Sequence, residues 1–252
     1  MISLLFVLFS GLVFGSFVTL ASYRLPLGED ILVRPSRCPK CETRLGFKDL
    51  WPVFSWLCSR GKCRHCKNPV SIRYPLTETA TAALFLLIYA RYDLTPPGIV
   101  LALMGVALLI MIVADLEHYM IPDQVHYMLL PLGLAWHVIS GTPAVEVIGG
   151  FALGGTIGLA LHHGYRLLRK KEGLGFGDVK FLAVAGLWLG MKPIVPFLFF
   201  SGLLGIITGL TWRALGKGPI FPFGPSLAVS LFVCIAFPEF PNLFWHIGQF
   251  VR

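Results

Sequence analysis

Long apolar runs alternate with short polar segments along most of the 252-residue chain. About 20 consecutive apolar residues cross a bilayer, with a range of roughly 17 to 25. By this measure the pattern predicts eight membrane-spanning helices, at 2–22, 77–92, 97–116, 124–140, 144–166, 178–191, 193–213 and 223–241. We therefore expect an all-α, polytopic membrane protein.

Composition supports this class and isolates one polar segment. The chain is 56% hydrophobic and 13% charged, with a mean hydropathy of +0.74, which excludes an ordinary soluble domain. Residues 23–76 hold 11 of the 21 Lys and Arg residues and five of the six cysteines. No Lys or Arg precedes position 23, so we expect an uncleaved first transmembrane helix rather than a signal peptide.

Basic residues predict how the helices cross the membrane. With eight spans and an outer N-terminus, the inner loops are 23–76, 117–123, 167–177 and 214–222. Counted with flanking positions, the inner side holds 18 Lys and Arg residues and the outer side only Arg91, Lys192 and Arg252. Positive residues gather on the cytoplasmic side of membrane proteins. We therefore expect a first helix at 1–22, a cytosolic cysteine-rich module at 23–76, and a seven-helix bundle at 77–252.

Small residues recur within the fifth expected helix, at Gly149, Gly150, Gly154, Gly155 and Gly158. Small residues spaced four apart let two membrane helices approach closely. The pattern predicts tight packing of this helix against a neighbour.

The polar module contains two CxxC pairs, and 21 residues separate them. Each CxxC turn presents two thiolates to one tetrahedral ion. Disulfides are the competing interpretation, but they rarely persist in the cytosol. Four thiolates leave no coordination position for a substrate, so we predict a structural zinc site rather than a catalytic one. The expected ligands are Cys38, Cys41, Cys63 and Cys66, with His65 as an alternative and Cys58 less favoured.

Two carboxylates stand where apolar runs meet polar segments. Asp115 ends the run that begins at Ile99, and Asp178 follows Gly175-Phe176-Gly177 and opens the next run. A carboxylate at a bilayer boundary is costly unless it is paired, hydrated or used. The predicted topology places both at cytoplasmic helix ends, at the same membrane depth. Two carboxylates that share a water can hydrolyse a peptide, because like charges at close range cannot both ionise and one stays protonated.

Other interpretations of single residues stay open. Asp178 and Asp123 each precede an apolar run and suit helix N-caps, and Asp115 could be an interfacial residue at a helix end. Gly175 and Gly177 permit unusual backbone angles and the close approach of a substrate strand.

The segment 115–123 contains three acidic residues and no Lys or Arg. It is either a short solvated turn or an acidic docking point for a basic substrate segment. In the cysteine-rich module, the run Trp51–Trp56 is expected to lie against the membrane interface or to cap the zinc site.

Motifs spread along nearly the whole chain resemble those of the bacterial type IV prepilin peptidases, which are GxGD-type aspartyl proteases. The residues that carry the resemblance are Gly15-Ser16-Phe17, Tyr23-Arg24-Leu25-Pro26, Pro35–Pro39 with the two CxxC pairs, Ser55-Trp56-Leu57, Gly61-Lys62-Cys63, Arg73–Glu78, Asp115-Leu116 through Ile121-Pro122-Asp123, and Gly175–Lys180. Together these motifs are highly specific.

The resemblance implies an endopeptidase of the bacterial inner membrane, multi-pass and with a periplasmic N-terminus. It would cleave the basic leader of type IV prepilins or pseudopilins after a glycine at the cytoplasmic face, within pilus or protein secretion systems. Expected partners are these substrates and membrane lipid, with no nucleic acid. The implied residues are Asp115 and Asp178 as the catalytic pair, Gly175, Gly177, Asp123 and Lys180 in support, and Glu117 and Asp123 at the leader.

The resemblance also implies N-methylation of the new N-terminus with S-adenosylmethionine. Glu78 and Arg24 would be associated with that step. One position departs from the family pattern Gly-Ser-Phe-x-Asn, since Thr19 stands in place of the asparagine. The chain lacks the glycine-rich turn of a soluble Rossmann methyltransferase, so this activity rests on the resemblance alone.

Two functions of other classes remain as alternatives. In a proton- or cation-coupled transporter, Asp115 and Asp178 would bind the ion at the midplane, whereas the predicted topology puts both near one face. In a non-catalytic assembly protein of a pilus or secretion system, the zinc module would bind a cytosolic partner.

Overall fold

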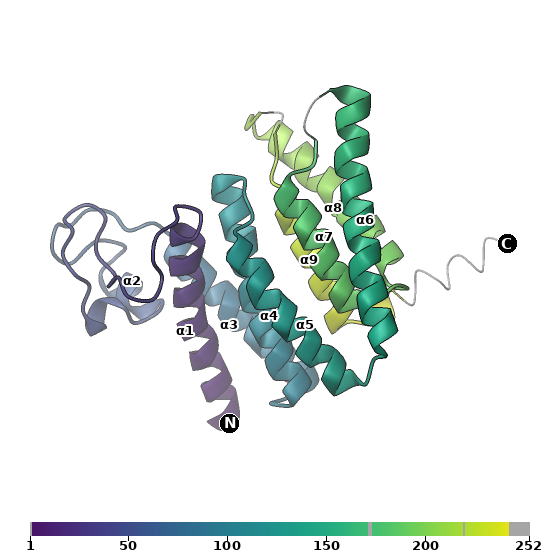
Figure 1. The fold of residues 1–252 in the computed structure, drawn as a ribbon. Helices are drawn as coiled ribbons and strands as arrows, with labels where there is room; N and C mark the ends of the chain where they lie inside the picture. Colours follow the sequence, from purple (N-terminus) through teal and green to yellow (C-terminus); the bar gives the residue numbers. More distant parts are fainter. Residues whose placement is uncertain (1, 171–172, 219, 242–252) are drawn as a thin grey trace. The chain divides into compact units, whose positions relative to one another are not determined.

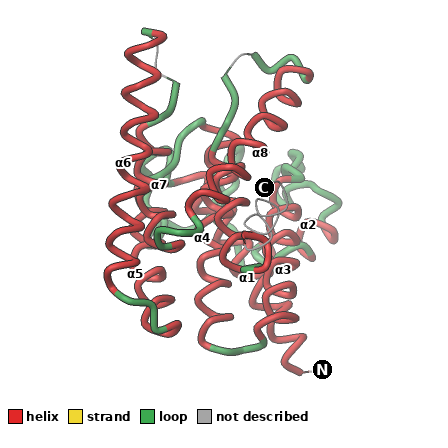
Figure 2. The backbone as a smooth tube through the Cα atoms, turned by 90° about the vertical axis from the view of Figure 1, so that its right-hand side faces the viewer, coloured by secondary structure: helices red, strands yellow, loops and turns green. Residues whose placement is uncertain are grey.

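The structure is a computed structural model that describes residues 2–170, 173–218 and 220–241. Two of the basic residues counted for the topology, Lys171 and Arg252, lie outside this range. Helices and loops make up the described residues, together with two isolated β-bridges (Figure 2). The chain divides into two compact units, residues 1–110 and 111–252.

A helix occupies each of the eight expected ranges. These helices are α1 (Ile2–Arg24), α3 (Arg73–Tyr92), α4 (Pro96–His118), α5 (Asp123–Ser140), α6 (Ala144–Arg169), α7 (Phe176–Leu189), α8 (Ile194–Ala214) and α9 (Gly224–Ala236). Among the described residues, α1, α4, α6 and α8 are long and apolar enough to cross a membrane. An apolar, helical membrane protein is thus confirmed, whereas the count of eight spans stays a prediction.

Two boundaries differ from the expected ones for identifiable reasons. α9 ends at Ala236 rather than 241, because Pro238 disfavours helical backbone at the preceding Phe237, whose φ and ψ are −132° and 72°. α7 begins at Phe176, so Asp178 lies inside its first turn rather than at its start.

In the first unit, α1 packs against α3 (Figure 1). A Cβ added at Gly15 would lie 2.5 Å from Glu78 Cα, and one added at Gly11 would lie 2.7 Å from Ala82 Cα. These glycines are four residues apart, the spacing that lets two helix backbones touch. The loop between α1 and α3 adds two elements that were not expected, the 3₁₀ turn η1 (Phe47–Asp49) and the short helix α2 (Phe54–Cys58).

In the second unit, α6 lies along α7 (Figure 1). A Cβ at Gly150 or Gly154 would run into the carbonyl oxygens of Gly186 and Leu182 on α7. The close packing predicted from the small residues of this helix is therefore confirmed.

Two side chains of the second unit join α5 to α7. His137 Nε2 lies 2.6 Å from Leu187 O, and Trp188 Nε1 donates to Leu129 O at 3.0 Å. Both contacts are buried, where a polar group without a partner is costly. α7 is thus held on one side by glycine packing and on the other by hydrogen bonds, and its first turn carries Asp178.

Candidate functional site

Asp115 lies near the C-terminal end of α4 and is 6% exposed. Its Oδ2 accepts a hydrogen bond from the backbone N–H of Gly224 at 2.7 Å. Gly224 is the first residue of α9, where the positive end of the helix dipole favours a negative charge. The carboxylate is therefore oriented by a helix that begins 109 positions away in the sequence.

Asp178 is the third residue of α7 and is half-buried. Its Oδ2 accepts the N–H of Gly175 at 3.1 Å, so the carboxylate caps its own helix as well as facing the site. Gly175 has an ordinary φ of −63°, and Gly177 is not among the residues with positive φ. The expectation of unusual backbone angles at these glycines is thus wrong.

At Gly177 another segment of the chain does come close to the turn that carries Asp178. A Cβ there would lie 3.3 Å from Ile121 Cβ. The segment before α5, which leads into Asp123, therefore lies directly against the turn that carries Asp178.

The structure brings the two predicted carboxylates together within the second unit. Asp115 and Asp178 are close enough to interact electrostatically. Both are substantially removed from water, where like charges repel more strongly than at the surface.

Asp123 and Lys180 form an ion pair at the edge of this site. Lys180 Nζ donates to Asp123 Oδ1 at 2.7 Å, and both side chains are about half exposed. The Lys180 ammonium also lies 5.5 Å from the centre of the Phe176 ring. The pair links the start of α5 to the first turns of α7, so part of the predicted acidic patch is already neutralised. Glu117, the other predicted leader-binding residue, is exposed near the end of α4.

His126 is a buried residue beside Asp123, and it was assigned no role from the sequence. The residue is 4% exposed, and its Nδ1 lies 3.8 Å from Asp123 Oδ1. Its ring meets Phe181 edge to face at 6.4 Å between centroids. The signal for it was weak, since one histidine on an apolar helix more often belongs to the core.

In the first unit the structure gathers the four predicted cysteine thiols. The Sγ atoms of Cys38, Cys41, Cys63 and Cys66 all lie within 4.8 Å of one another, and Cys38 Sγ is 3.9 Å from Cys66 Sγ. A tetrahedral zinc–thiolate site places sulfurs about 3.8 Å apart, so the donor set fits zinc. The expected Cys₄ cluster is confirmed, and Cys58 is exposed and outside it.

The two CxxC turns share one backbone design. Glu42 N–H donates to Cys38 O at 2.9 Å, and Lys67 N–H donates to Cys63 O at 3.0 Å. Glu42 and Lys67 occupy matching positions after the second cysteine and have φ values of 53° and 61°. Non-glycine residues rarely adopt this left-handed conformation, so two such turns in register indicate a built ligand site.

Hydrogen bonds favour the thiolate form at two of the four cysteines, Cys41 and Cys63, whereas the pKa of Cys38 is raised. Bonds from the side chain and backbone of Thr43 lower the pKa of Cys41 to about 6. Backbone hydrogen bonds from Cys66 and His65 lower the pKa of Cys63. The thiolate is the form that binds a metal, so each turn favours the ligand state at one of its two cysteines before an ion arrives.

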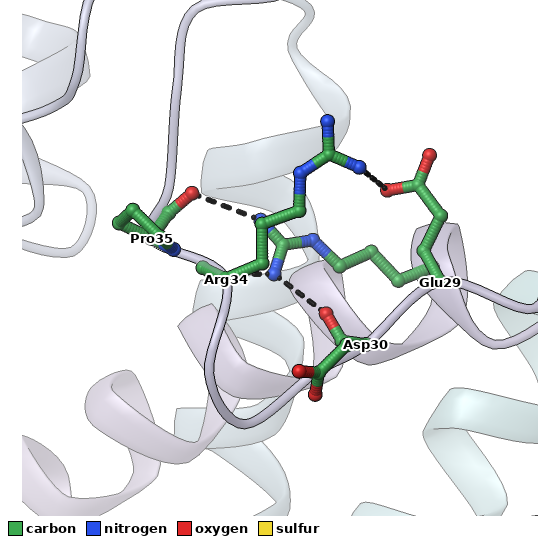
Figure 3. A network of polar contacts seen from close by, with 5 residues as sticks. Glu29, Asp30, Arg34 and Pro35 are labelled. Atoms are coloured by element: carbon green, nitrogen blue, oxygen red, sulfur yellow. Dashed lines mark hydrogen bonds and ion pairs between the residues drawn. The ribbon is translucent and has the colours of Figure 1, made fainter.

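Arg24 anchors the chain entering this module. It is 7% exposed, and its guanidinium donates to the carbonyl oxygens of Asp30 at 2.9 Å, Arg34 at 2.7 Å and Pro35 at 3.3 Å. Figure 3 shows these carbonyls beside the ion pair of Glu29 and Arg34, which spans 3.3 Å. Arg24 therefore gathers the loop that precedes the first CxxC pair.

Glu78 and Thr19 lie on the facing sides of α3 and α1. Glu78 is 6% exposed, and its Oε2 accepts the N–H of Val53 at 2.6 Å. The Thr19 hydroxyl donates to Gly15 O at 2.9 Å and is also hydrogen-bonded to the hydroxyl of Thr77. The residues predicted to serve methylation thus lie in the first unit, and both aspartates lie in the second.

One further site residue was missed from the sequence, namely Gly224. The dipeptide Gly224-Pro225 follows a loop and opens an apolar run, a pattern typical of a helix N-terminus. This signal indicates where α9 begins but not which side chain its free N–H meets.

Two protein-family models match the chain, one in its N-terminal part and one after it. Residues 9–92 match the bacterial Peptidase A24 N-terminal domain, and residues 101–210 match the type IV leader peptidase family. No solved structure matches the chain.

Curated relatives align over most of their own length. The prepilin leader peptidase/N-methyltransferase of Pectobacterium carotovorum subsp. carotovorum is 35% identical, over 87% of this chain and 88% of that protein. The protein of the same name from Neisseria gonorrhoeae is 33% identical, over 87% and 85%. That from Aeromonas hydrophila is 32% identical, over 95% and 92%. The chain belongs to the type IV leader peptidase family.

Proposed function

We propose that this protein is a membrane aspartyl endopeptidase that cleaves the leader of type IV prepilins or pseudopilins. The observation that carries the proposal is that Asp115 and Asp178 of the second unit lie close enough to interact electrostatically. Membership of a peptidase family supports hydrolysis over the transporter and assembly-protein alternatives.

The two carboxyl groups divide the chemistry between them. The ionised one takes a proton from a water molecule, whose oxygen attacks the carbonyl carbon of the scissile glycine. The protonated one donates a hydrogen bond to the carbonyl oxygen, where negative charge develops. Collapse of the tetrahedral intermediate breaks the C–N bond, and the departing amine takes up the proton that the carboxyl removed from the water. Gly175 and Gly224 orient the two carboxyls through their N–H groups.

Gly177 and the Asp123–Lys180 pair would support this site. Gly177 lets the Ile121 segment pack against the catalytic turn. The Asp123–Lys180 ion pair ties α5 to α7. Glu117 and Asp123 would hold the basic leader by charge, with the apolar part of the substrate left in the bilayer.

We further propose that the new N-terminus is methylated, as the names of the relatives suggest. S-adenosylmethionine would supply the methyl group, and the amine would lose a proton. Arg24 and Glu78 would act by holding the cysteine-rich module and α3 in place, since their polar atoms are occupied by backbone partners. Zinc bound by the four cysteines would stabilise that module.

The proposed setting is the bacterial inner membrane, with eight spans, a periplasmic N-terminus and domains at 1–22, 23–76 and 77–252. The described helices at all eight ranges and the excess of basic residues in the inner loops support it. Reporter fusions after each helix test the topology. A cytoplasmic signal from a fusion at the N-terminus would overturn it.

Co-expression with a prepilin that bears a basic leader tests the peptidase proposal. Wild type is compared with Asp115→Asn and Asp178→Asn, and the product N-terminus is read by mass spectrometry. We expect cleavage after the glycine in wild type and none in either variant, with both variants still inserted and helical. Cleavage that survives both substitutions would remove the carboxyl pair from the mechanism. An added methyl mass on the new N-terminus would report the second activity.

A further inference from the structure

The cysteine-rich module carries a row of exposed apolar side chains that its own fold does not cover. The row comprises Phe47, Leu50, Trp51, Phe54 and Leu57, whose exposed fractions range from 43% to 77%; we name it the aromatic ridge. Its rings contact one another edge to face, Phe47 with Trp51 at 6.1 Å and Trp51 with Phe54 at 6.4 Å between centroids. A contiguous exposed apolar patch on a polar module indicates an interaction surface.

The ridge is a preformed surface, because η1 and α2, which carry it, make polar contacts with the rest of the module. The Trp56 indole donates to Val70 O at 3.1 Å and lies against Gly61. Arg64 pairs with Asp49 of η1 at 3.4 Å. The two tryptophans of the run 51–56 therefore differ, since Trp56 is hydrogen-bonded within the module while Trp51 is 49% exposed.

A hydrogen bond ties the ridge to the helix pair of the first unit. Val53, which lies between Trp51 and Phe54 in the sequence, donates its N–H to Glu78 on α3 at 2.6 Å. Glu78 packs against Gly15 in the C-terminal half of α1, a helix long and apolar enough to cross a membrane. Figure 1 shows the module, with α2, at the level of the C-terminal half of α1 rather than beyond the end of that helix.

Charge around the ridge suits an anionic leaflet. Residues 23–76 contain eleven basic and four acidic residues. Lys48 lies within the ridge and Arg60 just after it, and both are exposed. Aromatic rings concentrate at the interface between headgroups and acyl chains, and neighbouring Lys and Arg residues are attracted to acidic phospholipids.

We propose that the aromatic ridge inserts into the headgroup region of the cytoplasmic leaflet and anchors the cysteine-rich module to the membrane surface. The occupant of the ridge is phospholipid. A prepilin segment is the less favoured occupant, because a basic leader would be repelled by the basic surroundings of the ridge. The anchor would hold the module at a constant height above the bilayer, independently of the chemistry at Asp115 and Asp178.

Photo-crosslinking in the full-length protein tests the proposal. The photoreactive residue p-benzoylphenylalanine replaces Phe47 or Phe54 on the ridge and, as a matched control, the exposed Arg44 that follows the first CxxC pair. Each protein is reconstituted into vesicles of phosphatidylethanolamine and phosphatidylglycerol, irradiated with and without prepilin, and analysed by mass spectrometry. We expect phospholipid adducts at 47 and 54 but not at 44.

Two results would overturn the proposal. One is the absence of phospholipid adducts at both ridge positions while the labelled proteins keep their zinc and their helical spectrum. The other is the replacement of lipid adducts by prepilin adducts when substrate is present, which would make the ridge a substrate-docking surface. Since neither readout depends on cleavage, the anchor and the peptidase mechanism can fail separately.

Discussion

The backbone N–H of Gly224 lies 2.7 Å from Oδ2 of Asp115, and the contact is buried. Position 224 has no room for a side chain, because an added Cβ would lie 2.7 Å from the same oxygen and 3.1 Å from Asp115 Cγ. α9 therefore reaches the site with its bare N-terminus. The next residue, Pro225, has no N–H, so Gly224 supplies the first donor of the helix.

Gly224→Ala should impair cleavage by moving Asp115. A displaced carboxylate no longer meets the substrate water, and a shift of about 1 Å can cost about a hundredfold in rate. We expect kcat to fall by about that factor with little change in KM. The matched control is Gly202→Ala on α8, where a Cβ meets nothing within 4 Å. Equal kcat in both variants would show that Gly224 does not position Asp115.

Lys180→Gln and Asp123→Asn should have opposite effects on substrate affinity. Lys180 neutralises Asp123 in the structure, so its removal adds negative charge for a basic leader and should lower KM. Asp123→Asn should raise KM, and both changes should shrink at high salt. The stability cost should be small, about 0.2–1 kcal/mol, because the pair is half exposed. If both variants raised KM alike, the pair would serve structure rather than leader binding.

Gly154→Ala should loosen the contact between α6 and α7. The added methyl would strike Leu182 O, and overpacking of this kind costs about 1–3 kcal/mol. Its neighbour Gly155 offers a control, because a Cβ there meets only Ala183 Cβ at 3.4 Å. Unfolding of each variant in detergent, followed by circular dichroism, should separate the two. Indistinguishable stabilities would mean that α6 can shift to absorb the methyl.

Removal of zinc should unfold the cysteine-rich module and spare the helices. Metal binding contributes directly to the folding of small domains with few apolar residues. We expect about one zinc per chain by elemental analysis. Cys63→Ser or a strong chelator should abolish it and expose 25–72 to protease. Cys58→Ser should keep the metal, since Cys58 lies outside the cluster. Full zinc content in Cys63→Ser would refute the ligand assignment.

Arg24→Lys should affect methylation more than cleavage. An ammonium cannot reproduce the two-nitrogen contact with the carbonyls of Asp30, Arg34 and Pro35, so the loop before Cys38 would loosen. The aspartates lie in the other unit, which this loop does not build. Mass spectrometry of the processed prepilin should show cleaved but under-methylated product. If Arg24→Lys lost cleavage and methylation to the same extent, Arg24 would be needed for the fold of the whole chain and not for methylation in particular.

Local patterns account for the parts of the structure that the sequence predicted. Apolar runs located a helix at each of the eight ranges. Among the described residues, four of these helices are long and apolar enough to cross a membrane, where a helix satisfies its own backbone hydrogen bonds. The CxxC spacing located the metal cluster, because each turn brings two sulfurs together without help from distant residues. A predicted helix boundary was wrong where a single residue ended the helix inside the apolar run, as Pro238 does after α9.

Contacts between distant segments account for the rest. The sequence by itself determined the helices, the four thiols, and two aspartates at the same expected membrane depth. Only the tertiary structure decided that Asp115 meets the N-terminus of α9, that Lys180 pairs with Asp123, and that Trp51 is exposed while Trp56 bonds to Val70. These relationships depend on how helices pack, through close glycine contacts and buried hydrogen bonds, and no local periodicity encodes which partner a helix end will face.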